Sequence, residues 1–156
     1  MTAAFEIVPL GALDLDRAAA LHGESFGPMG ERPWTRQDLA GLVASPGVAG
    51  YLLRLGNDDA GVALCRVAGV EAELLTIAVG PAWRRQGGAR RLLEAVIERV
   101  REAGATALFL EVGADNPAAR RLYEAHGFVE AGRRKAYYRR GALPPADALL
   151  MRRALD

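Results

Sequence analysis

A glycine-rich turn is the part of the sequence best suited to hold a charged ligand. The apolar run Leu75–Val79 leads through a short loop into Arg84–Ala89, which carries two arginines and two adjacent glycines and opens a long amphipathic stretch. A strand that delivers such a turn to a helix exposes free backbone N–H groups at the positive end of the helix dipole. These features predict an anion site, most naturally for a pyrophosphate. The alternative is that Gly87 and Gly88 merely start a helix.

Two common nucleotide-binding motifs do not describe this turn. A Walker loop ends in lysine followed by serine or threonine, whereas Lys135 is the only lysine of the chain. A dinucleotide-binding fingerprint needs the spacing G-x-G-x-x-G after a strand, and the turn lacks that spacing. Neither motif therefore accounts for the glycines.

The elements around the turn form a strand–helix–strand unit. Residues 88–103 have helical periodicity and end at Gly104, because one stripe is apolar: Leu92, Leu93, Val96, Ile97 and Val100. We expect the next apolar segment, Ala107–Val112, to return parallel beside Leu75–Val79 through a right-handed crossover. Asn116 and Pro117 then mark the start of a further helix, which Gly127 ends.

The remaining segments complete an α/β fold with a mixed sheet. Apolar spacing predicts helices over Leu13–Phe26 and Thr35–Val43, with loop residues between them. Alternating and β-branched segments predict five further strands: Phe5–Val8, Gly47–Leu55, Gly61–Val67, Phe128–Tyr138 and Ala148–Arg152. The first strands form an antiparallel meander that continues into Glu73–Val79, and a loop over Gly141–Pro145 separates the last two.

Length and composition favour one compact domain that stays where it is made. The chain has 156 residues, of which 51% are hydrophobic and 25% charged, enough for a single core. A net charge of +1 gives no field that would favour nucleic acid or a membrane surface as partner. The N-terminus lacks the basic start and apolar core of a signal peptide, and no apolar run is long enough to span a bilayer. We expect a cytoplasmic protein.

Metal chemistry is not expected from the cysteine and histidines. Cys65 is the only cysteine, so neither an intramolecular disulfide nor a thiolate cluster is possible. It alternates within a strand without a recognisable histidine partner, which favours a place in the core. His22 and His126 are too far apart in the pattern to suggest a metal site.

The glycine-rich turn resembles a known cofactor loop. Arg84-x-x-Gly87-x-Ala89 matches the [QR]-x-x-G-x-[GA] acetyl-CoA loop of GNAT acetyltransferases. Within that superfamily the chain is most similar to the RimI family of bacterial ribosomal-protein-alanine N-acetyltransferases, over roughly the last two-thirds of its length. The matching segments are Glu73–Val79, Phe109–Val112, Asn116–Ala119 and Leu122–Phe128, with Pro33–Thr35 and Tyr137–Tyr138 as shorter matches. The resemblance implies a single GNAT domain over residues 1–156, with a mixed central sheet and flanking helices.

The resemblance implies acetyl-CoA as cosubstrate and no metal. In GNAT enzymes the pantetheine arm pairs with the strand that corresponds to Ile77, Ala78 and Val79, where two parallel strands splay apart. The pyrophosphate would then bind the turn and the first helical residues: Arg84, Arg85, Gln86, Gly87, Gly88, Ala89 and Arg90. By family position Asn116 also contacts the cofactor, although its sequence context predicts a helix N-cap in any case.

Two residues match the catalytic pair of the RimI family. Glu111 matches the general base, acting directly or through water, and Tyr123 matches the acid that protonates the departing thiolate. A tyrosine hydroxyl keeps its proton at neutral pH, so this acid role is chemically reasonable. Each residue has a simpler alternative, because Tyr123 could be a core aromatic beside Leu122 and Glu111 an ordinary ion-pairing residue. Trp34 could line the substrate cleft or simply cap the core.

The acceptor is less well defined than the cofactor, because the chain departs from the RimI pattern on that side. Gly113 stands where arginine is common, and Pro144–Asp147 replaces an acidic pair. The leading hypothesis is transfer to the N-terminal alanine α-amine of a small-subunit ribosomal protein. A second enzyme hypothesis is transfer to another protein N-terminus, a lysine or a small-molecule amine. A third is a non-catalytic acetyl-CoA-binding module, which would not need Glu111 and Tyr123.

Overall fold

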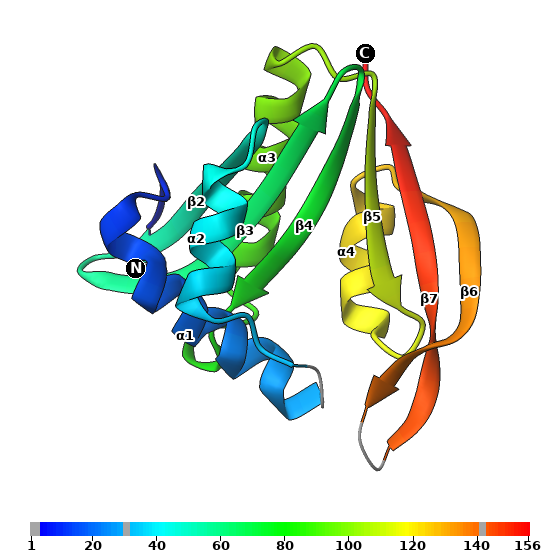
Figure 1. Ribbon diagram of the computed structural model, residues 1–156, viewed down its shortest axis with the longest axis horizontal. Helices are drawn as coiled ribbons and strands as arrows, with labels where there is room; N and C mark the ends of the chain where they lie inside the picture. Colours follow the sequence, from blue (N-terminus) through cyan, green and yellow to red (C-terminus); the bar gives the residue numbers. More distant parts are fainter. Residues whose placement is uncertain (1–3, 30–31, 141–142) are drawn as a thin grey trace.

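The computed structural model describes residues 4–29, 32–140 and 143–156. Within these residues, seven strands form one mixed sheet in the order β1-β2-β3-β4-β5-β7-β6 (Figure 1). The strands are β1 (Phe5–Pro9), β2 (Val48–Leu55), β3 (Asp58–Ala68), β4 (Glu71–Val79), β5 (Ala107–Gly113), β6 (Val129–Arg140) and β7 (Leu143–Ala154). The α-helices are α1 (Leu15–Phe26), α2 (Arg36–Ala44), α3 (Gly88–Glu102) and α4 (Pro117–Ala125). The predicted α/β architecture with a mixed sheet is confirmed.

The two faces of the sheet carry separate hydrophobic cores. On one face α3 and α4 cover the strands, and the predicted apolar stripe of α3 is buried along its whole length. On the other face α1 and α2 cover β2, β3 and β4 (Figure 1). Strand alternation assigns neighbouring residues to opposite cores, as with Leu52 under α1 and α2 and Leu53 under α3. Cys65 is fully buried in the α3 core, as predicted.

Strands β4 and β5 pair only at their beginning. The parallel register joins three residue pairs, from Glu71 opposite Ala107 to Glu73 opposite Phe109. Beyond this point the strands diverge (Figure 1), so the expectation that Ala107–Val112 lies beside Leu75–Val79 is wrong in register. A β-bulge helps to explain the divergence, because Leu75 is inserted between the residues of β4 that pair with β3. Such a bulge increases local twist and bends the strand.

Several element boundaries also differ from the prediction. Leu13 is 99% exposed, because the first residues form a short 3-10 turn over Ala12–Asp14 and α1 begins only at Leu15. The residues Gly27–Met29, expected as loop, form another 3-10 turn. The C-terminal strands are longer than predicted, and Pro144 and Pro145 lie within β7. Of the predicted loop, residues 141 and 142 lie outside the described residues.

The prolines are tolerated in β7 because that part of the strand has one neighbour. Strand β5 pairs with β7 only up to Gly113 opposite Ala148, whereas β6 pairs with β7 as far as Leu143. Pro144 and Pro145 therefore lie where β7 has an open edge on the β5 side. A proline, which cannot donate a backbone hydrogen bond, is accepted at such an edge.

Candidate active site

A cleft of about 990 Å³ opens where β4 and β5 diverge. It extends from the N-terminus of α3 to the segment that joins α1 and α2, and so reaches both faces of the sheet. With the exception of Gln86, all the residues predicted from the sequence to bind the cofactor or to take part in catalysis line this cleft. They are Ile77, Ala78, Val79, Arg84, Arg85, Gly87, Gly88, Ala89, Arg90, Glu111, Asn116 and Tyr123. The fold therefore brings together residues that are up to 46 positions apart, from Ile77 to Tyr123.

The turn before α3 has the backbone geometry of an anion site. Gly87 is the N-cap of α3 and adopts a left-handed conformation with φ of 84°, and Arg85 also has a positive φ of 63°. The first hydrogen bond of the helix runs from Arg91 N–H to Gly87 O, so the preceding N–H groups have no partner within the helix. Gly88 is buried against Leu53, which places the helix start close to the sheet.

Arg84 is fixed to the end of β4. Its Nε donates to Val79 O at 3.0 Å, and its Nη2 lies 3.5 Å from Ser25 Oγ. Ser25 Oγ also donates to Val79 O at 3.3 Å. This network ties the turn, β4 and α1 together, so Arg84 stabilises the shape of the turn as well as adding charge to it.

Strand β4 presents unpaired backbone groups to the cleft. Its residues Ile77, Ala78 and Val79 pair antiparallel with β3 on one side, while the pairing with β5 has already ended at Glu73. In a strand with one neighbour, the N–H and C=O groups that face away from it are free to bind a ligand; the exception here is Val79 O, which accepts from Arg84 and Ser25. The end of β4 can therefore accept an extended amide-containing chain.

Tyr123 lies on α4 and is 95% buried, with 5% of its surface exposed. Its ring packs edge-on against Phe128 at a centroid distance of 5.8 Å. Burial, with a smaller contribution from Tyr138, raises the pKa of Tyr123 above its ordinary value. The hydroxyl therefore keeps its proton at all physiological pH values. Tyr123 is both a core aromatic and a wall of the cleft, so the two sequence readings are compatible.

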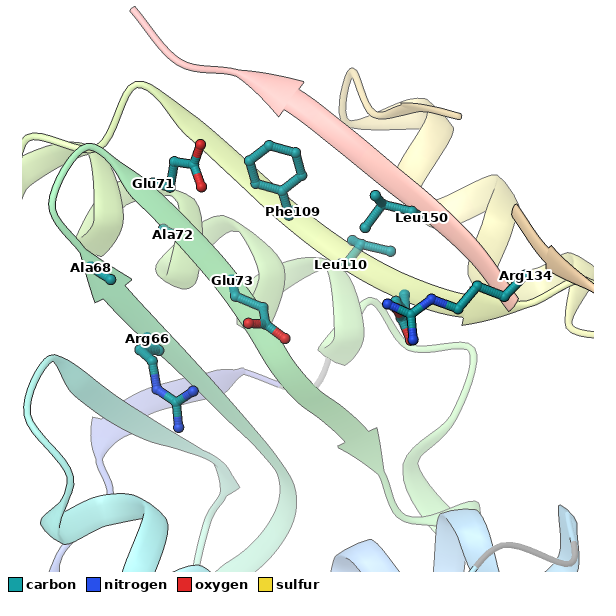
Figure 2. Close-up of a pocket in the computed structure, with 10 residues that line it drawn as sticks. Arg66, Ala68, Glu71, Ala72, Glu73, Phe109, Leu110, Arg134 and Leu150 are labelled. Atoms are coloured by element: carbon teal, nitrogen blue, oxygen red, sulfur yellow. The ribbon is translucent and has the colours of Figure 1, made fainter. Parts of the chain in front are cut away.

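Glu111 lies near the end of β5, on the face away from α3 and α4. Its carboxylate forms an ion pair with Arg134 of β6 at 3.7 Å. It stands at the junction of the cleft with a smaller hollow of about 370 Å³ on the same face. Figure 2 shows this hollow, with Arg134 extending toward β5 and Glu73 turned toward the space between β4 and β5. Glu111 is thus accessible from solvent.

Asn116 caps α4 as predicted. Its Oδ1 accepts the backbone N–H of Ala119 at 3.2 Å, and Pro117 occupies the first helical position. The residue also lines the cleft. The cap is confirmed, and the cofactor contact stays a prediction.

The structure places Trp34 in the lining of the cleft, one of the two positions expected for it, and adds His22 and Phe26, which the sequence did not predict there. On the face covered by α1 and α2, the cleft is walled by His22, Phe26 and Trp34. Sequence reasoning had considered His22 only as a metal ligand, and the described residues contain no group of three or more His, Cys, Asp or Glu side chains that could hold a metal. Helical spacing could have placed His22 on the buried side of α1, because it follows Ala18 by four positions and Leu15 by seven. None of the helices in the described segments is long and apolar enough to cross a membrane.

Comparisons with known proteins agree with this geometry. The Acetyltransferase (GNAT) family model matches residues 15–128. The N-alpha-acetyltransferase RimI of Mycobacterium tuberculosis is 38% identical over 160 residues, which cover 98% of this chain and 96% of that protein. The [ribosomal protein bS18]-alanine N-acetyltransferase of Escherichia coli K12 is 47% identical over 106 residues, 68% of this chain and 71% of that protein.

Structural similarity extends over the whole chain. The crystal structure of the ribosomal-protein-S18-alanine N-acetyltransferase from Escherichia coli superimposes with a TM-score of 0.88 and 32% identity, covering 98% of this chain and 95% of that one. The expected GNAT fold and the similarity to RimI proteins are both confirmed. The chain therefore belongs to the GNAT acetyltransferase family, whose members use acetyl-CoA, and is an N-acetyltransferase.

Proposed function

We propose that this enzyme acetylates the free α-amine of a protein N-terminus, and that its acceptor is the N-terminal alanine of a small-subunit ribosomal protein. The observation that carries the proposal is that Glu111 and Tyr123 line one cleft together with the glycine-rich turn of α3. The names of the relatives support the acceptor, because they specify an N-α-acetyltransferase and an alanine N-acetyltransferase of ribosomal protein bS18.

The cofactor half of the cleft fits the two chemical parts of acetyl-CoA. The unpaired N–H groups of residues 85–90 and the positive end of α3 suit the pyrophosphate, with Arg84 and Arg85 adding charge. The open edge of Ile77–Val79 suits the amide groups of the pantetheine arm, and Asn116 lies on the same side of the cleft. In this arrangement the thioester lies between β4 and β5, near Glu111 and Tyr123.

An α-amine as the acetyl acceptor suits the weak general base that the site offers. Only an uncharged amine can attack the thioester. With a pKa near 7.8, about a third of an α-amine is neutral at pH 7.5, whereas a lysine with a pKa near 10.4 is about 0.1% neutral. An α-amine thus has a roughly 250-fold advantage before any contact with the enzyme is made. Glu111, exposed and paired with Arg134, needs to remove only a weakly held proton.

The proposed reaction proceeds by direct attack within the cleft. The amine nitrogen bonds to the thioester carbon, the carbon–sulfur bond breaks, and the amine proton passes to Glu111 directly or through water. Tyr123 donates its hydroxyl proton to the departing sulfur and regains a proton from solvent after the thiol leaves. General acid–base pairs of this kind contribute about 10² to 10⁴ in rate per group.

The raised pKa of Tyr123 is compatible with this role. A phenol of high pKa is a weak acid towards a thiolate in water, because thiols have a pKa near 8.5. In the cleft, the same desolvation that raises the pKa of the tyrosine also raises the pKa of the departing thiolate. The two proton affinities therefore move in the same direction, and the buried hydroxyl is always protonated when the sulfur departs.

Peptide acetylation tests the proposal. The substrates are an alanine-initiated peptide with a free α-amine and no lysine, and a peptide with a blocked N-terminus and one lysine. We expect acetyl transfer from acetyl-CoA to the first peptide only, located by mass spectrometry. We expect Tyr123→Phe and Glu111→Gln to lower kcat by about 10² or more.

Matched variants separate chemistry from folding. Tyr137→Phe removes a hydroxyl from a half-exposed tyrosine of β6, and Glu73→Gln removes a carboxylate from the smaller hollow; both should retain most of the activity. Acetylation of the lysine peptide alone would contradict the proposed acceptor. Full activity in Tyr123→Phe would contradict its role as the acid, even if the acceptor is correct.

A further inference from the structure

Three aromatic rings form a continuous wall on the α1 and α2 side of the cleft. The ring of His22 stacks on that of Trp34 at a centroid distance of 4.5 Å and an interplanar angle of 10°. The ring of Phe26 lies 4.5 Å from that of His22, tilted by 35°. All three residues line the cleft and come from α1 and the segment before α2, on the sheet face opposite α3 and α4. We call these three residues the aromatic wall.

Hydrogen bonds hold Trp34 in a fixed position in this wall. Its backbone N–H donates to His22 Nδ1 at 3.1 Å. The next residue, Thr35, begins the capping box of α2. Its backbone N–H donates to Asp38 Oδ2 at 2.9 Å, and the backbone N–H of Asp38 donates to Thr35 Oγ1 at 3.1 Å. The backbone on both sides of the indole is therefore anchored, and the stacking on His22 orients the indole ring itself.

His22 is suited to hold Trp34 only in its neutral form. Because Nδ1 accepts the hydrogen bond, the ring proton of the neutral tautomer is on Nε2. The side chain is 95% buried, with 5% exposure, and it lies between two aromatic rings. A protonated ring would lose its acceptor nitrogen and would place a charge inside an apolar cluster. The wall is thus uncharged in the working enzyme.

We infer that the aromatic wall limits the size of the acceptor's first side chain, and that His22 acts as a positioning residue for Trp34. This inference rests on the proposed function, because it concerns an acceptor whose α-amine reaches Glu111. An amine that approaches from the α1 and α2 face has its own side chain next to the rings. A rigid indole there leaves room for a small side chain such as that of alanine and excludes a branched or longer one.

The test compares acceptors that differ only in their first residue. Peptides beginning with Ala, Ser, Val or Leu, otherwise identical and free of lysine, are assayed at saturating acetyl-CoA. For Trp34→Ala we expect the ratio of kcat/KM for the Leu peptide to that for the Ala peptide to rise at least tenfold. The KM for acetyl-CoA should stay within twofold of the wild-type value, because the proposed pyrophosphate contacts are backbone groups of the α3 turn, which this substitution does not alter.

The role of His22 is tested by two contrasting variants. His22→Phe keeps a stacked ring but removes the acceptor nitrogen, and it should raise the Leu-to-Ala ratio at least threefold, mainly through KM. His22→Asn places an oxygen near the position of Nδ1, so its Leu-to-Ala ratio of kcat/KM should stay within twofold of the wild-type ratio. The thermal shift induced by acetyl-CoA shows whether Trp34→Ala is folded. If it is not, Trp34→Phe opens the wall by a smaller amount and replaces it in the test.

The outcomes distinguish this inference from the function on which it rests. If the wild type acetylates the Ala peptide and Trp34→Ala lowers kcat/KM for all peptides by the same factor, the size limit is wrong and the function stands. If His22→Phe and His22→Asn behave alike, the positioning role of His22 is wrong. If the wild type acetylates none of the free α-amines, the proposed function fails and this inference fails with it.

Discussion

Acidification should weaken the fold through His22. Burial lowers the pKa of this imidazole from 6.5 to about 4, an effect that the nearby Asp38 carboxylate partly opposes. Between these two pH values the unfolded chain binds a proton that the folded chain does not. Stability from the neutral ring is therefore fully present above pH 6.5 and declines as the pH falls toward 4.

The size of this effect follows from the two pKa values. One pKa unit corresponds to about 1.4 kcal/mol, so the full shift represents at most roughly 3 kcal/mol. Between pH 7 and pH 4.5, the linkage relation gives a loss of roughly 2 kcal/mol. Asp38 also has a lowered pKa, but its contribution is lost only as the pH falls below the ordinary range of aspartate. Glu94 has a pKa lowered from an ordinary value of 4.5, so its contribution begins to decline within this window, and comparison with a variant that lacks the imidazole isolates the histidine.

Urea unfolding of the wild type and of His22→Phe at pH 7, 6, 5 and 4.5 measures this difference. At pH 7 the variant should be less stable, by about 1 to 3 kcal/mol, because the Trp34 N–H loses its buried acceptor. The difference should shrink by roughly 2 kcal/mol at pH 4.5, since only the wild type carries the titrating ring. A constant difference across the range, or an NMR titration of His22 with a midpoint near 6.5, would refute the reasoning.

Two further predictions concern the α3 turn and the core. Gly88→Ala should destabilise the protein by about 1 to 3 kcal/mol, because the new Cβ would lie 2.5 Å from Cδ2 of the fully buried Leu53; Gly87→Ala faces open space and should cost only about 1 to 2 kcal/mol for its left-handed backbone. Thermal unfolding compares the two, and a larger loss for Gly87→Ala would contradict the packing argument. Cys65→Ala should retain the acetylation rate within twofold, and the wild-type thiol should react slowly with thiol reagents because burial raises the pKa of Cys65; loss of activity without loss of fold would show that the cysteine has a part in the chemistry.

The features predicted correctly from the sequence are those that local physics determines. The apolar stripe of α3 and its glycine stop depend on helical periodicity and on the left-handed conformation of Gly104, whose φ is 89°. The cap of α4 depends on Asn116 and Pro117, which act within one turn of the chain. The glycine-rich turn is equally local. Each of these signals lies within a few residues, so no knowledge of the tertiary structure was required.

The features that were missed depend on contacts between distant segments. The register of β4 and β5 is set by the bulge at Leu75 and by the pairing of β5 with β7, neither of which has a pattern in the sequence. Leu13 is apolar but exposed, because the helix that would have buried it begins two residues later. His22 acquires its role only when α1 brings it against Trp34, twelve residues away. Such contacts follow from packing and not from composition.

This contrast has a consequence for how the enzyme selects its substrates. In the proposed function, the cofactor half of the cleft consists mostly of backbone groups at the edge of β4 and the start of α3. The acceptor half is made of side chains from separate segments: His22 and Phe26 on α1, Trp34 before α2, Glu111 on β5 and Tyr138 on β6. Substitutions there can change the acceptor while the acetyl-CoA site stays intact. Under the proposed function, acceptor specificity therefore depends on the side chains around β5 and α1, and the backbone groups of the α3 turn do not determine it.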